Sequence, residues 1–393
     1  MKKTTIISIL LTAATALLCL CGVFFCSRET TGLTSSTEIT SANPKAEFKS
    51  QKALEYLALC KSSYYPQSLE ARLKEMGFGN FQYFVSEQTT SADNGIAFGV
   101  ATNENSIIAV FRGTEKEEWF SNFNIGGGEE HDGFSQAAGY AAERLKEYAA
   151  DYNLPTENTQ MIITGHSRGA AVANIAASRF IDLGNFKSVV GYTFATPCTT
   201  TKASAKNERY QSIFNVLNPE DFICYIPLEE WGFTRYGTDF ELPMKDSPDF
   251  STYYKEMEEC FYDKTGYKHI GFENHHEDVR SFLSAAYTIA PTVNDYYNKE
   301  IAVYPYCVTL YEYMNKAAAL LAGQDTLKSG MFLISGCNTP TLCTMTNFIM
   351  QGVDIEDVAK SNDLSTSAVA SAHIWETYEA WLKVLPNEYF LLN

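Results

Sequence analysis

The residues with the clearest chemical signature lie in one short stretch. The apolar, β-branched run Met161–Thr164 leads into Gly165-His166-Ser167-Arg168-Gly169, and an Ala-rich segment with helical spacing follows. A Gly-x-Ser-x-Gly pattern between a strand and a helix is typical of a nucleophile elbow, a sharp turn that raises its serine above the sheet edge. Larger neighbours would collide in such a strained turn, which explains the two glycines. The stretch therefore predicts Ser167 as a nucleophile.

A serine hydroxyl needs a histidine that removes its proton and an acid that orients the histidine. In chains with this kind of elbow the order is serine, acid, histidine. Two of the six histidines, His131 and His166, precede Ser167. The base is therefore expected among the four that follow it. These are His269, His275, His276 and His373.

The composition of the whole chain narrows the function classes. With 393 residues, of which 45% are hydrophobic, the chain can bury a large core. The formal net charge of −17 argues against nucleic acid as a partner and against electrostatic docking on anionic lipid. The cysteines beyond residue 26 have no Cys-x-x-Cys spacing, and the pair His275-His276 has no third ligand at usable spacing. We therefore expect neither a metal nor a cofactor.

The N-terminal segment has the features of a targeting sequence. Lys2 and Lys3 precede an uncharged run from Thr4 to Cys26, which is long enough to cross a bilayer. Positive charge on this flank predicts that the N-terminus stays cytoplasmic and the rest crosses the membrane. Residues 1–27 are therefore predicted to be a membrane anchor, with a signal peptide cleaved after Cys21 as the alternative. Either way we expect an extracytoplasmic protein, anchored at the cell surface or secreted.

The rest of the chain divides into a linker and one large domain. Residues 28–50 are rich in Ser, Thr, Gly and charged residues and predict a flexible linker. The folded domain is expected over residues 51–393. Within it, residues 240–365 are aromatic, acidic and interrupted, which predicts a largely helical insertion or cap.

Periodicity predicts the elements that position the serine. The expected strands are Phe81–Ser86, Gly95–Thr102, Ser106–Phe111, Met161–Thr164, Ser188–Phe194 and Ser212–Leu217. The expected helices are Gln51–Cys60, Gly133–Tyr152 and Gly169–Leu183. Strands that alternate with helices indicate an α/β fold with a mostly parallel sheet covered on both faces.

Four further motifs flank the elbow. They are Val110-Phe111-Arg112-Gly113-Thr114, His131-Asp132-Gly133-Phe134, Thr193-Phe194-Ala195-Thr196-Pro197 and Asn218-Pro219-Glu220-Asp221. With the elbow, they resemble the class 3 lipase family, the fungal-lipase-like α/β-hydrolases, from about Ser106 to Gly237. The resemblance implies an α/β-hydrolase fold and a serine carboxylic-ester hydrolase without a cofactor. Its substrate would be a lipid or another acyl ester. The resemblance is to a bacterial-type member, which the N-terminal segment predicts to be extracytoplasmic.

The resemblance also implies the acid and the base. Asp221 is the expected acid, with Glu220 as the close substitute, because it follows the end of a strand, where ligand chemistry sits in open α/β sheets. His373 is the expected base, because the family's histidine lies near the C-terminal end, ahead of a final helix. The gap from Asp221 to His373 is longer than is usual in the family, so a large insertion must be accommodated. His269 is the main competitor, ahead of the pair His275-His276.

The remaining roles concern the oxyanion and the surroundings of the serine. The backbone amides of Thr114 and Arg168 are expected to hold the oxyanion. For the Arg168 side chain, a contact with an anionic head group and a structural ion pair both remain open. Trp119–Gly128 occupies the family's lid position, with a surface loop as the alternative, and His131 is expected to be structural rather than substrate-facing.

Two other functions are compatible with the same residues. A serine acyltransferase would use the same nucleophile, acid and base and would differ only in its acceptor. A non-catalytic surface binding protein could also be built on this scaffold.

Overall fold

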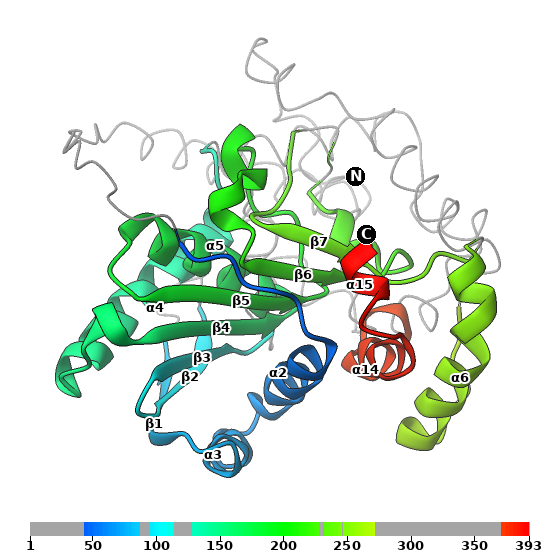
Figure 1. The fold of residues 1–393 in the computed structure, drawn as a ribbon, viewed down its shortest axis with the longest axis horizontal. Coiled ribbons are helices and arrows are strands. Elements are labelled where there is room, and N and C mark those ends of the chain that lie inside the picture. The colour runs from blue at the N-terminus through cyan, green and yellow to red at the C-terminus, as the bar shows by residue number, and fades with distance from the viewer. Residues whose placement is uncertain are drawn as a thin grey trace, which may run out of the picture.

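The computed structural model describes residues 43–86, 95–113, 128–227, 229, 232–245, 247–271 and 371–392 (Figure 1). The predicted anchor, Thr114, His275, His276 and most of the predicted lid and insertion lie outside these ranges. Within the ranges, no helix combines the length and the apolar character that crossing a bilayer requires. The membrane anchor therefore stays a prediction.

A single seven-stranded sheet forms the centre of the described part, and its strands neighbour one another in chain order. The strands are β1 (Gly79–Val85), β2 (Ala97–Thr102), β3 (Ser106–Phe111), β4 (Gln160–His166), β5 (Ser188–Phe194), β6 (Ile213–Leu217) and β7 (Thr238–Glu241). The pairs β1–β2 and β2–β3 are antiparallel, whereas all pairs from β3 to β7 are parallel. The carboxyl ends of β3 to β7 therefore meet at one edge of the sheet.

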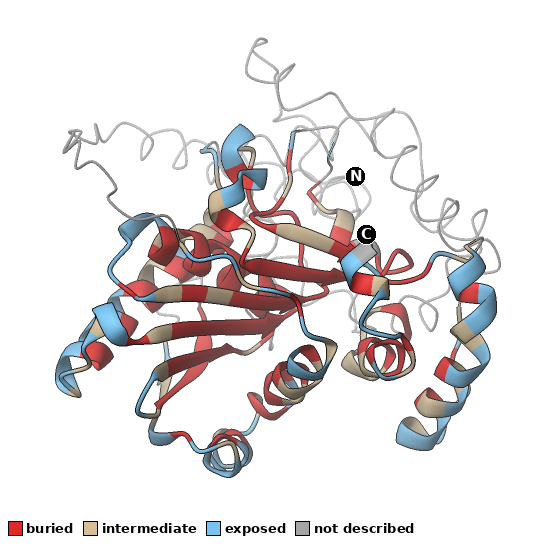
Figure 2. Cartoon of the chain, in the orientation of Figure 1, coloured by how far each residue is buried: buried red, intermediate tan, exposed pale blue. Residues whose placement is uncertain are grey.

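Helices cover both faces of the sheet (Figure 1). One face carries α2 (Ser50–Ser62), α3 (Pro66–Glu75), α6 (Pro248–Thr265), α14 (Trp375–Val384) and α15 (Tyr389–Leu392), and the other carries α4 (Asp132–Asp151) and α5 (Arg168–Leu183). Short 3-10 helices are η2 (Thr156–Asn158), η3 (Ala203–Lys206), η4 (Glu208–Tyr210) and η5 (Phe222–Tyr225). The parallel strands β3 to β6 are buried along most of their length, and the helices expose their outer sides (Figure 2).

The alternation of side chains along the strands creates two separate cores. On β3, Ile108 and Val110 belong to the core under α2 and α14. The intervening Ile107 and Ala109 belong to the core under α4 and α5. This arrangement confirms the predicted α/β-hydrolase fold with a mostly parallel sheet.

The boundaries of the predicted linker and insertion are wrong at one end each. Phe48 is buried, with its ring centroid 4.7 Å from that of Phe240, and the Asn43 amide donates to the Val189 carbonyl at 3.0 Å. Residues 43–50 therefore belong to the folded domain, because the burial of the Phe48 ring holds this polar segment against the sheet. The predicted insertion from 240 likewise begins inside β7, which completes the parallel sheet.

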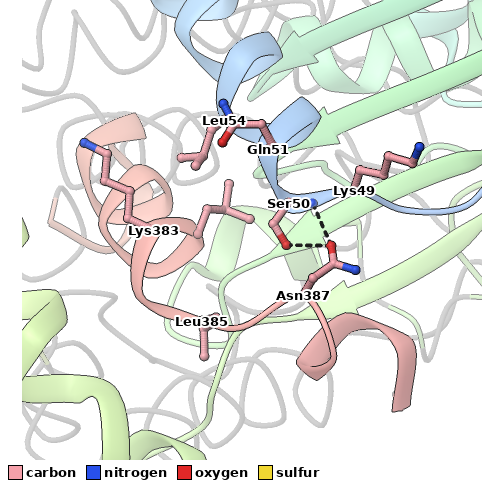
Figure 3. A pocket seen from close by; sticks show the side chains of 8 residues that line it. Lys49, Ser50, Gln51, Leu54, Lys383, Leu385 and Asn387 are labelled. Atoms are coloured by element: carbon pink, nitrogen blue, oxygen red, sulfur yellow. Dashed lines mark hydrogen bonds between the residues drawn. The ribbon is translucent and has the colours of Figure 1, made fainter.

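The C-terminal segment, residues 371–392, packs back onto the sheet beside α2 and α6 (Figure 1). The Trp381 ring lies 5.6 Å from that of Phe250 on α6. At the start of α2, the Ser50 backbone N–H and hydroxyl both donate to Asn387 Oδ1 at 3.1 Å, beside a shallow depression between the two segments (Figure 3). These contacts fix the position of α14, which lies near the C-terminal end of the sequence.

Candidate active site

Ser167 occupies the turn between β4 and α5 in a backbone conformation that few non-glycine residues adopt. Its φ is 58° and its ψ is −131°, and its backbone N–H donates to the Phe194 carbonyl at 2.9 Å. A Cβ on Gly165 would collide with the backbone of Gly169, and one on Gly169 would collide with the Phe111 carbonyl. Only glycine fits at either flank, so the sequence reaches this strained turn through its two glycines.

The His373 side chain connects Ser167 to Asp221. His373 Nε2 lies 2.9 Å from Ser167 Oγ, and His373 Nδ1 lies 2.7 Å from Asp221 Oδ2. Because a carboxylate only accepts, Nδ1 carries the proton and Nε2 is free to accept the serine proton. The structure thus brings together the three residues predicted as nucleophile, base and acid, although 152 positions separate Asp221 from His373.

Both carboxylate oxygens of Asp221 accept hydrogen bonds. Its side chain is 1% exposed, and its Oδ1 accepts from the Ile223 backbone N–H at 3.1 Å, which caps η5. Its Oδ2 also accepts from the Tyr378 hydroxyl at 2.8 Å. A buried carboxylate is stable only when such donors satisfy it.

Tyr378 on α14 is a functional residue that the sequence reasoning missed. It is fully buried, and besides donating to Asp221 its hydroxyl accepts from the Asn218 backbone N–H at 3.2 Å. Burial and the charge of Asp221 raise the pKa of Tyr378 well above its usual value, so the hydroxyl keeps its proton. No sequence motif contains Tyr378, and only its position five residues after His373 could have indicated a contact near the base.

The alternative base and acid have other surroundings. His269 is 4% exposed and lies against α6, with Nδ1 3.4 Å from the Tyr254 hydroxyl and its ring 5.1 Å from that of Phe261. Of the histidines that the structure describes, His373 is the one whose ring contacts Ser167 Oγ. The carboxylate that contacts His373 belongs to Asp221 rather than to its neighbour Glu220.

The other predicted residues are placed as follows. Arg168 is the first residue of α5 and its side chain is 1% exposed. The N–H groups of a first helical turn have no partner within the helix, which suits the Arg168 amide to an oxyanion. Thr114 lies outside the described residues. His131 is fully buried at the N-cap of α4 and stacks on Phe134, with ring centroids 3.9 Å apart, in keeping with a structural role.

Two buried thiols in the described ranges are poor competitors of Ser167 as nucleophiles. Burial raises the pKa of the Cys60 thiol to about 12 and that of the Cys198 thiol to about 11, so both stay protonated at neutral pH. Within these ranges no group of three or more His, Cys, Asp or Glu side chains is arranged to hold a metal ion.

The sequence also matches a known protein family over part of its length. Residues 101–231 match the class 3 lipase family. Over that segment the chain is similar to this family. The matched residues include the elbow and the loop that ends in Asp221, whereas His373 lies beyond them. A lipase-type hydrolase is therefore indicated.

Several solved structures are similar to part of this chain. The Rhizomucor miehei triacylglyceride lipase is 19% identical with a TM-score of 0.39, over 49% of this chain and 79% of that one. The lipase from Rhizopus microsporus var. chinensis is 16% identical with a TM-score of 0.40, over 56% and 86%. Lipase II from Rhizopus niveus is 17% identical with a TM-score of 0.41, over 49% and 80%.

Proposed function

We propose that this chain is a class 3 lipase family member that hydrolyses acyl esters of lipids through Ser167, His373 and Asp221. The observation that carries the proposal is the hydrogen-bonded chain from Asp221 Oδ2 through the His373 ring to Ser167 Oγ. Nucleophile, base and orienting acid within hydrogen-bond reach of one another are what acyl transfer by a serine requires.

In the first half of the reaction, Ser167 Oγ attacks the acyl carbonyl while its proton passes to His373 Nε2. The buried Asp221 carboxylate stabilises the imidazolium that forms. The backbone N–H groups of Arg168 and, as the resemblance implies, Thr114 hold the oxyanion. His373 then returns the proton to the leaving alcohol, which departs and leaves an acyl group on Ser167.

In the second half, His373 takes a proton from water, and the resulting hydroxide attacks the acyl-enzyme. The tetrahedral intermediate collapses, the acid product leaves, and Ser167 recovers its proton from His373. An acyltransferase would differ only at this point, because an alcohol would replace the water. New ester formed in the presence of added alcohol would identify that alternative.

The test compares single substitutions with matched controls. Ser167→Ala and His373→Ala should each lower kcat for a series of p-nitrophenyl acyl esters by several orders of magnitude, and the double variant should be hardly worse, because triad members act as one unit. Ser167→Ala should also abolish labelling by a fluorophosphonate.

Two controls change a residue of the same type that lacks the proposed role. Ser178→Ala removes a buried hydroxyl from the same helix, α5, where it donates to the Ile175 carbonyl, and should keep labelling and turnover. His269→Ala should cost little beyond a local packing defect. Turnover by Ser167→Ala within tenfold of the parent, or no labelling of the parent, would contradict the proposal and favour a binding protein.

A further inference from the structure

His166, the residue between Gly165 and Ser167, makes a contact that the mechanism above does not use. Its Nε2 lies 2.9 Å from the backbone carbonyl oxygen of His373. A carbonyl oxygen only accepts, so His166 Nε2 carries the proton and donates. The His166 side chain is 4% exposed. It therefore contacts the protein at the base rather than a bound ester.

The surroundings of His166 keep its ring uncharged. The ring centroids of His373, Trp375 and Tyr378 lie 5.1, 5.8 and 6.0 Å from that of His166. Burial, followed by the nearby charge of His373, lowers the pKa of His166 to about 3. Its Nδ1 has no hydrogen-bond partner among the described residues, so the structure offers nothing that would stabilise a second proton there.

The backbone at His373 needs a donor from elsewhere in the chain. Residues 371–373 are helical, but the chain becomes extended at Ile374, with φ −70° and ψ 148°. Carbonyls at the end of a helical turn have no partner within it. The preceding carbonyl, that of Ala372, accepts from Asn218 Nδ2 at 2.9 Å. The loop 218–221, which ends in Asp221 and is called the acid loop below, thus holds one carbonyl of the segment that carries the base. The elbow holds the next carbonyl.

We propose that His166 is a positioning residue whose Nε2–H holds the His373 backbone so that the imidazole spans Ser167 and Asp221. The proposal rests on the ester hydrolysis proposed above. Because His166 is neutral, it fixes the base without placing a second positive charge beside the imidazolium that forms during turnover. The residue next to the nucleophile therefore acts on the base, and the elbow positions both reacting groups.

Three substitutions of His166 separate the donor from the volume of the ring. His166→Leu and His166→Asn lack a donor at the Nε2 position, whereas His166→Gln has an amide N–H at a similar reach. Since a displacement of about 1 Å can cost about 100-fold in rate, we expect Leu and Asn to lower kcat roughly 10- to 100-fold. KM should stay within about twofold, because no contact with substrate is lost, and Gln should retain kcat within about threefold.

A double-mutant cycle tests whether His166 acts through His373. In a His373→Ala background, His166→Leu should change the residual rate less than twofold or so, because the group it positions is already absent. Equal losses in both backgrounds would overturn the proposal. A His166→Asn variant with the kcat of the parent would also overturn the proposal. This variant provides the test if His166→Leu does not fold.

His269 provides the matched control because it is buried to the same 4%. His269→Leu and His269→Gln should leave kcat unchanged while costing stability comparable to that lost at His166. The same preparations include Ser167→Ala. If Ser167→Ala keeps its activity, ester hydrolysis by Ser167 itself is wrong; if it is inactive and the His166 variants match the parent, only the positioning role is wrong.

Discussion

At the residue scale, the sequence identifies groups that react but not groups that hold them. Ser167 could be predicted because its backbone strain requires two glycines, and Asp221 and His373 because they occupy positions in a motif order. Tyr378 and the Nε2–H of His166 could not, because their contacts depend on how α14 packs against the acid loop and the elbow. Such contacts leave no spacing in the sequence.

Tyr378→Phe tests the support of the acid. The substitution keeps the buried ring and removes the donor to Asp221 Oδ2, so a buried carboxylate loses one of its hydrogen bonds. We expect roughly 1–3 kcal/mol of lost stability in urea unfolding, as for a hydrogen bond to a buried charge, and a kcat reduced up to about tenfold. Tyr389→Phe is the control, because its hydroxyl donates to the Glu241 carbonyl at the surface, and it should change both quantities little. If Tyr378→Phe is as stable as the parent, the Tyr378 hydroxyl does not stabilise the Asp221 carboxylate.

At the scale of elements, the hydrophobic periodicity predicts six strands and three helices to within two residues at each end. Long apolar runs such as Ser188–Phe194 are unambiguous because both of their faces are buried. By contrast, β7 is four residues long with only Phe240 buried, so its pattern is too short to recognise. The extended chain at 43–49 was missed because one buried ring, Phe48, fixes an otherwise polar segment.

The tight approach of α5 to the end of β3 gives a prediction at this scale. A Cβ on Gly169 would meet the Phe111 and Arg112 backbone, which cannot yield, so Gly169→Ala should displace α5 and lose most activity. We expect a destabilisation of roughly 1–3 kcal/mol, the usual range for overpacking. Gly139→Ala on α4 would meet only the end of the Arg179 side chain, at 3.4 Å. There the helical propensity of Ala should raise stability by about 0.5–1 kcal/mol. Thermal unfolding of both variants measures the contrast.

At the scale of the whole molecule, a late segment of the chain completes the site. The 152 positions between Asp221 and His373 do not separate them in space, because α14 packs between α2 and α6 on one face of the sheet. From the sequence, this gap was the main departure from the family pattern and kept His269 open as the base. The number of residues between Asp221 and His373 therefore does not predict whether their side chains meet, because the packing of α14 decides that contact.

Titration of the buried His166 and the partly buried Glu130 should make the stability of the whole molecule sensitive to acid. For His166, the folded pKa of about 3 lies below the unfolded value near 6.5, so the unfolded state binds more protons between them and stability falls as pH falls through that window. For Glu130, burial opposes the charged form, but hydrogen bonds and charge from Arg179, Tyr236 and Lys202 lower the pKa to about 2. Its stabilisation is present above about 4.5 and is lost as pH falls towards 2.

Urea unfolding between pH 7 and 3 separates the two contributions. In His166→Gln, the fall in stability between pH 6.5 and about 5 should be shallower than in the parent by up to about 1.4 kcal/mol per pH unit, the value for one proton. Glu130→Gln should flatten only the lower window, below about pH 4.5. The groups that face His166, namely His373 and Tyr378, are unchanged in both variants, and the net charge of −17 shrinks on acidification in all of them alike. Identical slopes in the parent and His166→Gln above pH 5 would mean that His166 takes up a proton as readily in the folded protein as in the unfolded chain, and its role as a neutral donor would then fail.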